Sequence, residues 1–124
     1  MSKKILIIDD EKDVQTYLRT LFKNNGFESE TASNGEDGYI TAKQYKPDLI
    51  TLDILMPKQS GIKLYRQIKS DDELKEIPVI IITGLSQYQK FYSQDFSDLP
   101  EPEELLEKPV NQDKLIIKVK ELIG

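Results

Sequence analysis

Three short apolar segments lack the alternation of polar and apolar residues that a half-exposed strand shows. They span residues 5–8, 49–52 and 79–82 and are rich in β-branched side chains, with Thr51 as the one polar member. Strands that are buried on both faces of a parallel sheet have this pattern. We therefore predict three core strands at these positions.

Three other stretches have apolar residues at the spacing of a helix that lays one face on a sheet. The apolar positions are Val14, Leu18, Leu21 and Phe22 in the first stretch, Ile62, Tyr65 and Ile68 in the second, and Leu115, Ile116, Val119, Leu122 and Ile123 in the last. We expect the last helix to begin after Pro109, at Asn111 or Gln112.

Turn residues indicate a further strand and a further helix between the first two core strands. Gly26 is expected to end the first helix as a C′ glycine, and residues 27–32 then have the polar pattern of an edge strand. Asn34 and Gly35 turn the chain into a second helix, which Gly38 is expected to weaken.

A short fifth strand is predicted near residues 105–107. The chain then alternates strand and helix from end to end, which predicts one α/β domain over residues 1–124, with an open five-stranded parallel sheet and helices on both faces.

Four aromatic residues fall on one face of a further short helix: Tyr88, Phe91, Tyr92 and Phe96. This face either packs on the sheet or binds a partner. It is followed by an acidic segment, residues 95–107, in which Pro100 and Pro102 prevent a helix.

The composition limits the chemistry that the chain can perform. It has no cysteine and no histidine, so thiolate and imidazole catalysis are excluded, and any metal should be a hard cation on oxygen ligands. The net charge is −5 and no dense Lys/Arg run occurs, so we expect no nucleic-acid binding. No apolar segment approaches the roughly 20 residues of a membrane span, so we expect a cytoplasmic protein with no membrane association.

Polar residues stand at the end of each predicted core strand and of the short fifth strand. Asp9 and Asp10 follow the first strand, Asp53 the third, Thr83 the fourth and Lys108 the fifth. The carboxyl ends of parallel strands meet at one edge, where such sheets bind ligands. Carboxylates that converge there need a cation, and Mg²⁺ suits an all-oxygen site near a phosphate. A lysine and a threonine can hold phosphate oxygens while a carboxylate acts as nucleophile, so the set predicts phosphoryl transfer to an aspartate.

Most of these residues also have a structural explanation when taken alone. Asp10 can be the N-cap of the first helix, Thr83 is an ordinary strand residue, and Lys108 with Pro109 can form a turn. Asp53 has no evident cap or turn role. Their joint position at one edge favours the functional interpretation.

With these residues, the chain resembles the receiver domain of two-component response regulators, of the stand-alone, chemotaxis-regulator-like type, over essentially its whole length. The motifs that carry the resemblance are residues 7–11, residues 48–57 with Ser60 and Gly61 following, residues 78–84 and residues 107–110. The resemblance implies a flavodoxin-like sheet of strand order 2-1-3-4-5. It also implies a signalling protein that accepts phosphate, rather than an enzyme.

The resemblance assigns roles to the site residues. Asp53 would be the phosphoacceptor, and Asp10, Asp53 and the backbone carbonyl of Leu55 would bind Mg²⁺ directly. Asp9 would reach the metal through water. Lys108 would pair with the phosphoryl group.

The resemblance further implies that Thr83 is a switch residue and that the Lys108–Pro109 bond is cis. Two features depart from the family pattern. Leu105 stands where the family usually has an aromatic switch residue, and the segment between Thr83 and Lys108 is longer than usual. The phosphorylated state is expected to last long, because Leu55 and Leu85 occupy the positions that gate the attacking water in the family. Apolar side chains there should exclude water and slow the loss of phosphate.

A sensor histidine kinase or phosphotransfer protein would donate the phosphoryl group, and an unknown protein would receive the signal, since we expect no output domain after Gly124. A phosphatase of the haloacid dehalogenase type is disfavoured, because Leu55 stands where its second aspartate should be. A flavodoxin-type electron carrier is disfavoured because residues 9–11 would repel a flavin phosphate. An unphosphorylated, receiver-like interaction module stays open as the alternative.

Overall fold

The computed structural model describes residues 2–84 and 98–124. The strands are β1 (Lys4–Ile8), β2 (Glu28–Ala32), β3 (Leu49–Leu52), β4 (Val79–Thr83) and β5 (Glu104–Glu107). The helices are α1 (Lys12–Asn24), α2 (Gly35–Tyr45), α3 (Ser60–Ser70) and α5 (Gln112–Ile123), with a 3₁₀ turn, η1 (Pro57–Gln59), before α3. Every strand and helix predicted for these residues is present. The predicted aromatic face, from Tyr88 to Phe96, lies outside the described residues.

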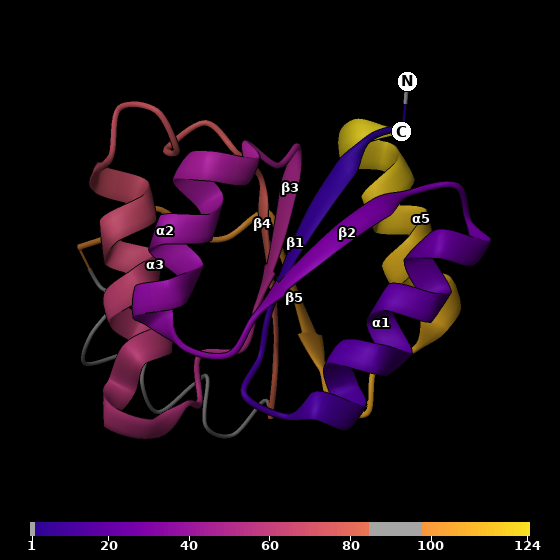
Figure 1. The fold of residues 1–124 in the computed structure, drawn as a ribbon, viewed down its shortest axis with the longest axis horizontal. Helices are drawn as coiled ribbons and strands as arrows, with labels where there is room; N and C mark the ends of the chain where they lie inside the picture. The colour runs from indigo at the N-terminus through magenta and orange to yellow at the C-terminus, as the bar shows by residue number, and fades with distance from the viewer. Residues whose placement is uncertain (1, 85–97) are drawn as a thin grey trace.

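The strands form one parallel sheet in the order β2-β1-β3-β4-β5 (Figure 1). This confirms the predicted flavodoxin-like order. The chain leaves β1 for β2 on one side and returns to β3 on the other side, so the strand order reverses between β1 and β3. The carboxyl ends of these two strands therefore lie at the switch point where open parallel sheets bind ligands.

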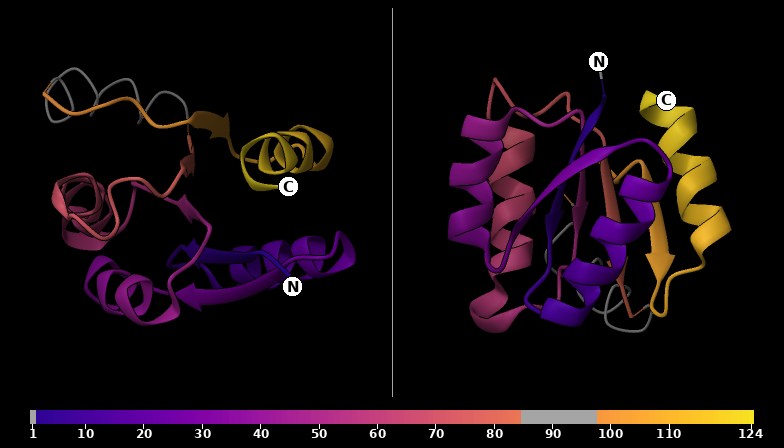
Figure 2. Two further views of the ribbon diagram at one scale, coloured as in Figure 1. Left: turned by 90° about the horizontal axis from the view of Figure 1, so that it is seen from above. Right: turned by 45° about the vertical axis from the view of Figure 1, so that its right-hand side comes forward.

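Helices cover both faces of the sheet, with α2 and α3 on one face and α1 and α5 on the other (Figures 1 and 2). Successive residues of β1 point to opposite faces: Leu6 and Ile8 join the core under α2 and α3, whereas Ile5 and Ile7 join the core under α1 and α5. Two separate cores thus share each central strand, which explains why these strands show no polar alternation.

Cap hydrogen bonds and one backbone conformation explain where three of the helices begin or end. Gly26 adopts a left-handed φ of 88° just after the C-cap of α1. Asn34 caps α2 by accepting a hydrogen bond from the Asp37 amide at 2.8 Å, and Asn111 caps α5 in the same way. These positions match the predicted helix boundaries.

Gly38 has a packing role that the sequence did not indicate. A Cβ atom at this position would lie 2.8 Å from Leu64 Cδ2 and 3.1 Å from Ile8 Cδ1. The glycine therefore lets α2 approach both α3 and β1, in addition to its expected cost in helix propensity.

None of the helices in the described part of the chain combines the length and apolarity that crossing a membrane requires.

Candidate functional site

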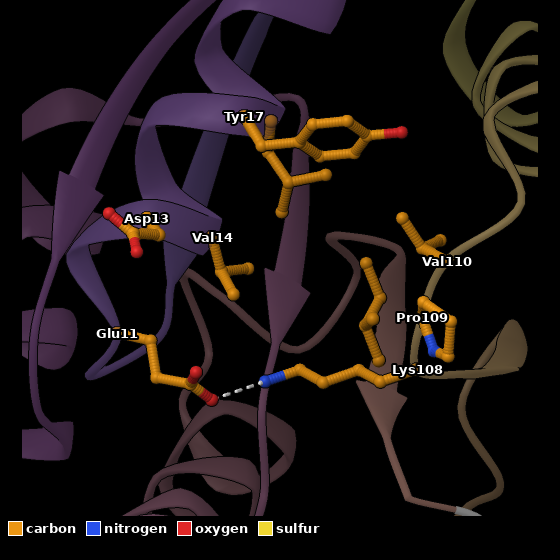
Figure 3. A pocket seen from close by; sticks show the side chains of 9 residues that line it. Glu11, Asp13, Val14, Tyr17, Lys108, Pro109 and Val110 are labelled. Atoms are coloured by element: carbon orange, nitrogen blue, oxygen red, sulfur yellow. Dashed lines mark hydrogen bonds and ion pairs between the residues drawn. The ribbon is translucent and has the colours of Figure 1, made fainter.

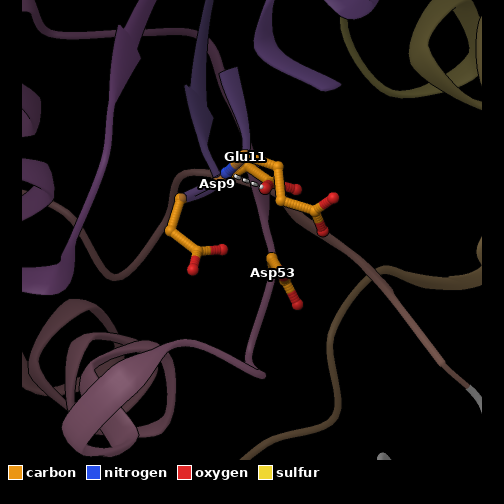
Figure 4. Close-up of side chains that lie close together, drawn as sticks. Asp9, Glu11 and Asp53 are labelled. Atoms are coloured by element: carbon orange, nitrogen blue, oxygen red, sulfur yellow. Dashed lines mark hydrogen bonds between the residues drawn. The ribbon is translucent and has the colours of Figure 1, made fainter. Parts of the chain in front are cut away.

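The predicted site residues gather at the carboxyl edge of the sheet. Asp9 follows β1, Asp53 follows β3, Thr83 ends β4 and Lys108 follows β5. Figure 4 shows the side chains of Asp9 and Glu11, which follow β1, close to that of Asp53, which follows β3. The sheet thus assembles residues that are up to about 100 positions apart in sequence.

The Lys108 ammonium group lies among three carboxylates. Its Nζ atom is 3.0 Å from Asp9 Oδ2, 3.1 Å from Asp53 Oδ2 and 3.3 Å from Glu11 Oε1. Burial alone would lower the pKa of Lys108, but the hydrogen bond to Asp9 and the negative charge of Asp53 outweigh it and raise this pKa above its ordinary value. The lysine therefore stays charged at physiological pH.

The other oxygen of each buried aspartate accepts a backbone hydrogen bond. The Glu11 amide donates to Asp9 Oδ1 at 2.8 Å, and the Leu55 amide donates to Asp53 Oδ1 at 2.9 Å. Asp9 and Asp53 are only 3% and 4% exposed. Burial raises the pKa of Asp9, although the Glu11 amide and Lys108 act against this rise. Both carboxylates are consequently fixed in orientation, with one oxygen toward the main chain and one toward the lysine.

Asp10 completes a cluster that can hold a cation. One oxygen from each of Asp9, Asp10, Glu11 and Asp53 lies within 4.8 Å of the others. Asp10 is exposed, and the N-cap of α1 is Glu11, so the alternative that Asp10 caps this helix is wrong. A set of carboxylates without nitrogen or sulfur ligands fits a hard divalent cation such as Mg²⁺.

Thr83 and Leu55 border this cluster. Thr83 is 1% exposed, and its carbonyl oxygen accepts a hydrogen bond from the Lys108 amide at 3.1 Å. Leu55 is 45% exposed, and its amide contacts Asp53. The Lys108–Pro109 bond is cis, which confirms what the resemblance implied. Leu85, the second expected water-gating residue, lies outside the described residues.

Two residues of this site, Glu11 and Gln15, had no role that could be assigned from the sequence. Glu11 was seen only as part of an acidic motif, whereas its carboxylate contacts Lys108. Gln15 was not identified at all, yet it is 4% exposed and its Nε2 donates to the Asp9 carbonyl oxygen at 2.6 Å. A signal existed, because Gln15 is a polar residue on the same helix stripe as Leu18 and Phe22.

A mostly apolar groove of about 560 Å³ opens beside Lys108, between α1 and the connection from β5 to α5. Figure 3 shows Val14 and Tyr17 on one side of it and Val110 on the other, with the contact between Glu11 and Lys108 at one end. The groove therefore adjoins the acidic cluster and gives the site an apolar border.

Comparisons with known proteins relate the chain to one family. The family model described as the response regulator receiver domain matches residues 5–120. The chain is 35% identical over 114 residues to protein PilH of Pseudomonas aeruginosa, with 87% of this chain and 94% of PilH covered. It is also 35% identical over 86 residues to the polar-differentiation response regulator DivK of Brucella anthropi, with 69% of this chain and 70% of DivK covered.

Among solved structures, the chemotaxis response regulator CheY4 of Vibrio cholerae has a TM-score of 0.83 to this chain. The two are 21% identical, and the match covers 98% of this chain and 99% of CheY4. At this level of identity the likeness concerns the fold.

Proposed function

We propose, from the premise that the chain belongs to the response regulator receiver domain family, that Asp53 accepts a phosphoryl group and that the protein acts as a single-domain switch in a phosphorelay. The observation that carries this proposal is the contact of one lysine ammonium with both buried aspartates, at 3.0 Å from Asp9 and 3.1 Å from Asp53. The protein would carry a signal rather than turn over a substrate.

In the proposed transfer, an Asp53 carboxylate oxygen attacks the phosphorus of a phosphohistidine on a partner protein. A P–O bond forms, the P–N bond breaks, and the histidine nitrogen keeps the electron pair of that bond and takes up a proton. Lys108 already lies beside the attacking carboxylate, so its charge can stabilise the phosphoryl oxygens without a large rearrangement. The Leu55 amide holds the second Asp53 oxygen and orients the nucleophile.

Receiver domains typically bind Mg²⁺ at an acidic pocket, and the donor set of this chain fits that ion. We assign Asp10, Asp53 and the Leu55 carbonyl as direct ligands and Asp9 as a ligand through water. A cation held by these residues would supply positive charge to neutralise the phosphoryl oxygens.

Thr83 is assigned as the residue that responds to phosphorylation. It is buried in the strand next to β5 and its carbonyl is bonded to the Lys108 amide, so a movement at the site can reach β5. Leu105 of β5 stands in place of the family's aromatic switch residue and packs against the core under α2 and α3. The readout in this chain therefore differs from the usual exchange of a ring between two positions.

The partners follow from this chemistry. A sensor histidine kinase or phosphotransfer protein donates the phosphoryl group, and a downstream protein of unknown identity binds the switched surface. On the grounds of composition, we propose that the partners include neither nucleic acid nor a membrane, and that the protein is located in the cytoplasm. The apolar groove beside Lys108 gives a donor protein a surface to pack on next to the acidic cluster.

The experiment is the intact mass of the protein after incubation with acetyl phosphate, with and without Mg²⁺. We expect a single phosphoryl adduct that requires both Mg²⁺ and Asp53, so that Asp53→Asn gives none. Asp72→Asn is the matched control, because the Asp72 side chain is 95% exposed and follows α3, outside the acidic cluster. An absence of adduct in folded wild-type protein contradicts the proposal and favours an unphosphorylated interaction module.

A further inference from the structure

Gln15 is a buried polar residue that the proposed reaction does not use directly. It lies in α1 with only 4% of its surface exposed. Its Nε2 atom donates two hydrogen bonds, one to the Asp9 carbonyl oxygen at 2.6 Å and one to Ser33 Oγ at 3.0 Å. A buried amide that spends both of its N–H donors on fixed acceptors holds those acceptors in place.

The first of these bonds acts on the chain segment that carries the acidic pair. The Asp9 amide donates to the Ala32 carbonyl at 3.1 Å, so the end of β1 is tied to β2. The Asp9 carbonyl shares a rigid peptide plane with the Asp10 nitrogen and Cα. Gln15 fixes the orientation of that plane and thereby the direction in which Asp10 leaves the main chain.

Asp10 depends on this support more than its neighbours do. Asp9 and Asp53 accept hydrogen bonds at both carboxylate oxygens. Within the described residues, no donor of the protein contacts the Asp10 carboxylate, which is exposed. Because no such bond holds this carboxylate, the main chain alone limits where it can reach, through the direction in which the side chain leaves Cα.

The second bond anchors Gln15 itself. Ser33 lies in the connection between β2 and α2, so Gln15 links three parts of the fold: α1, the end of β1 and the end of β2. Lys12 also donates to Ser33 Oγ, at 3.4 Å and in an exposed position. The anchor keeps the Gln15 amide from rotating away from the Asp9 carbonyl.

We propose that Gln15 is a positioning residue for the cation pocket, which holds Asp10 in the orientation that binds Mg²⁺ by fixing the peptide between Asp9 and Asp10. The inference rests on the proposed function, because it takes Asp10 as a ligand of the cation. Loss of a hydrogen bond that orients a metal ligand typically weakens metal binding about 10–100-fold.

The test is the Mg²⁺ dissociation constant, measured by isothermal titration calorimetry on wild type and Gln15→Met. Methionine keeps the length of the side chain and removes both donors. We expect binding to weaken by about tenfold or more. Gln44→Met is the matched control, because Gln44 is exposed on α2, and its dissociation constant should equal that of wild type. The backbone amide resonance of Asp10 should also shift in Gln15→Met before any Mg²⁺ is added.

Ser33→Ala separates positioning from a general loss of stability. Because Ser33 acts on Asp9 through Gln15, Ser33→Ala alone should weaken Mg²⁺ binding by a smaller factor than Gln15→Met does. Added to Gln15→Met, it should not weaken the binding any further. Additive losses in the double variant contradict the proposal. If Gln15→Met does not fold, Ser33→Ala alone decides, and an unchanged dissociation constant contradicts the proposal.

The outcomes distinguish this inference from the function on which it rests. If wild type does not bind Mg²⁺, or if Asp10→Asn binds it equally well, the proposed metal site is wrong. If wild type binds Mg²⁺ through Asp10 and Gln15→Met binds it with the same dissociation constant, the metal site stands and the role of Gln15 is wrong. A lower urea midpoint with an unchanged dissociation constant also contradicts the role of Gln15.

Discussion

Lys108 is the residue on which the electrostatics of the site depend most. Its ammonium group contacts Asp9, Asp53 and Glu11, and no other basic side chain of the described residues pairs with the two buried carboxylates. Lys108→Met should therefore slow formation of the acetyl-phosphate adduct by about 100-fold, the usual cost of losing one group that stabilises charge in a transition state. Lys120→Met on the exposed side of α5 serves as the control. A rate within a factor of about two of wild type would contradict the role assigned to Lys108.

Leu55 is expected to control how long the phosphoryl group persists. Its side chain is 45% exposed beside Asp53, so an apolar group borders the path by which water reaches the site. Leu55→Asn should speed the loss of phosphate from the adduct, followed as the decay of the intact-mass signal after acetyl phosphate is removed. The matched change Ile117→Asn, at an exposed apolar residue of α5, should leave the decay unchanged. An equal decay in Leu55→Asn would show that this side chain does not limit water.

At this scale, the sequence is sufficient for residues whose position follows from the end of a strand. Asp9, Asp53 and Lys108 could be predicted because the carboxyl ends of parallel strands must meet. Gln15 could not, because its partners are a main-chain carbonyl and a serine 18 positions away, and the choice of side-chain conformation depends on both. Glu11 could be seen as acidic, but its contact with Lys108 depends on the approach of a residue 97 positions away.

Between elements, Gly61 sets how closely α3 approaches the end of β3. A Cβ atom at Gly61 would lie 2.5 Å from both the Asp53 carbonyl oxygen and Ile54 Cα. Gly61→Ala should therefore displace α3 or the nucleophile, lower the free energy of unfolding by about 1–3 kcal/mol and slow phosphorylation. Urea unfolding and the adduct rate measure the two effects. Gln67→Ala on the exposed face of α3 should change neither. If Gly61→Ala has the unfolding free energy and the adduct rate of wild type, the backbone around Gly61 relaxes freely and the prediction is wrong.

A second pair of elements is joined by Asp71, which follows α3 and binds two side chains of α2. Tyr39 donates to it at 2.6 Å and Lys43 pairs with it at 3.0 Å, and together they lower the pKa of Asp71 to about 2. A carboxyl whose pKa is lower in the folded state stabilises the protein above its unfolded pKa, near 4, and loses this contribution as the pH falls toward 2.

The free energy of unfolding of wild type should therefore decrease between pH 5 and pH 2 more steeply than that of Asp71→Asn. The measurement is urea unfolding across this pH range, with Asp72→Asn as the control, since the Asp72 side chain is exposed. Parallel pH profiles for wild type and Asp71→Asn would contradict the coupling of the two helices through this carboxylate.

The ends of the elements were predictable where a local signal exists. Asn34, Asn111 and Gly26 mark helix boundaries through bonds or backbone conformations within a few residues. The packing roles of Gly38 and Gly61 were not predictable, because the atoms that their missing side chains would meet belong to elements elsewhere in the chain.

For the molecule as a whole, the fold followed from two properties of the sequence. Strands without polar alternation required helices on both faces, and the alternation of strand and helix required parallel pairing. The strand order 2-1-3-4-5 came from the resemblance, since local patterns do not determine which neighbours pair. The order matters for function because it brings the ends of β1 and β3 together and leaves β5 with Lys108 close enough to contact both aspartates.

The most direct test of the account is the location of the phosphoryl group. Protein treated with acetyl phosphate and Mg²⁺ can be reduced with borohydride, which converts an aspartyl phosphate to homoserine, and the position of the homoserine is then read by peptide mass spectrometry. We predict homoserine at position 53 and at no other aspartate. Homoserine at Asp9 or Asp10, or none in folded protein, would contradict the assignment of Asp53 as the phosphoacceptor.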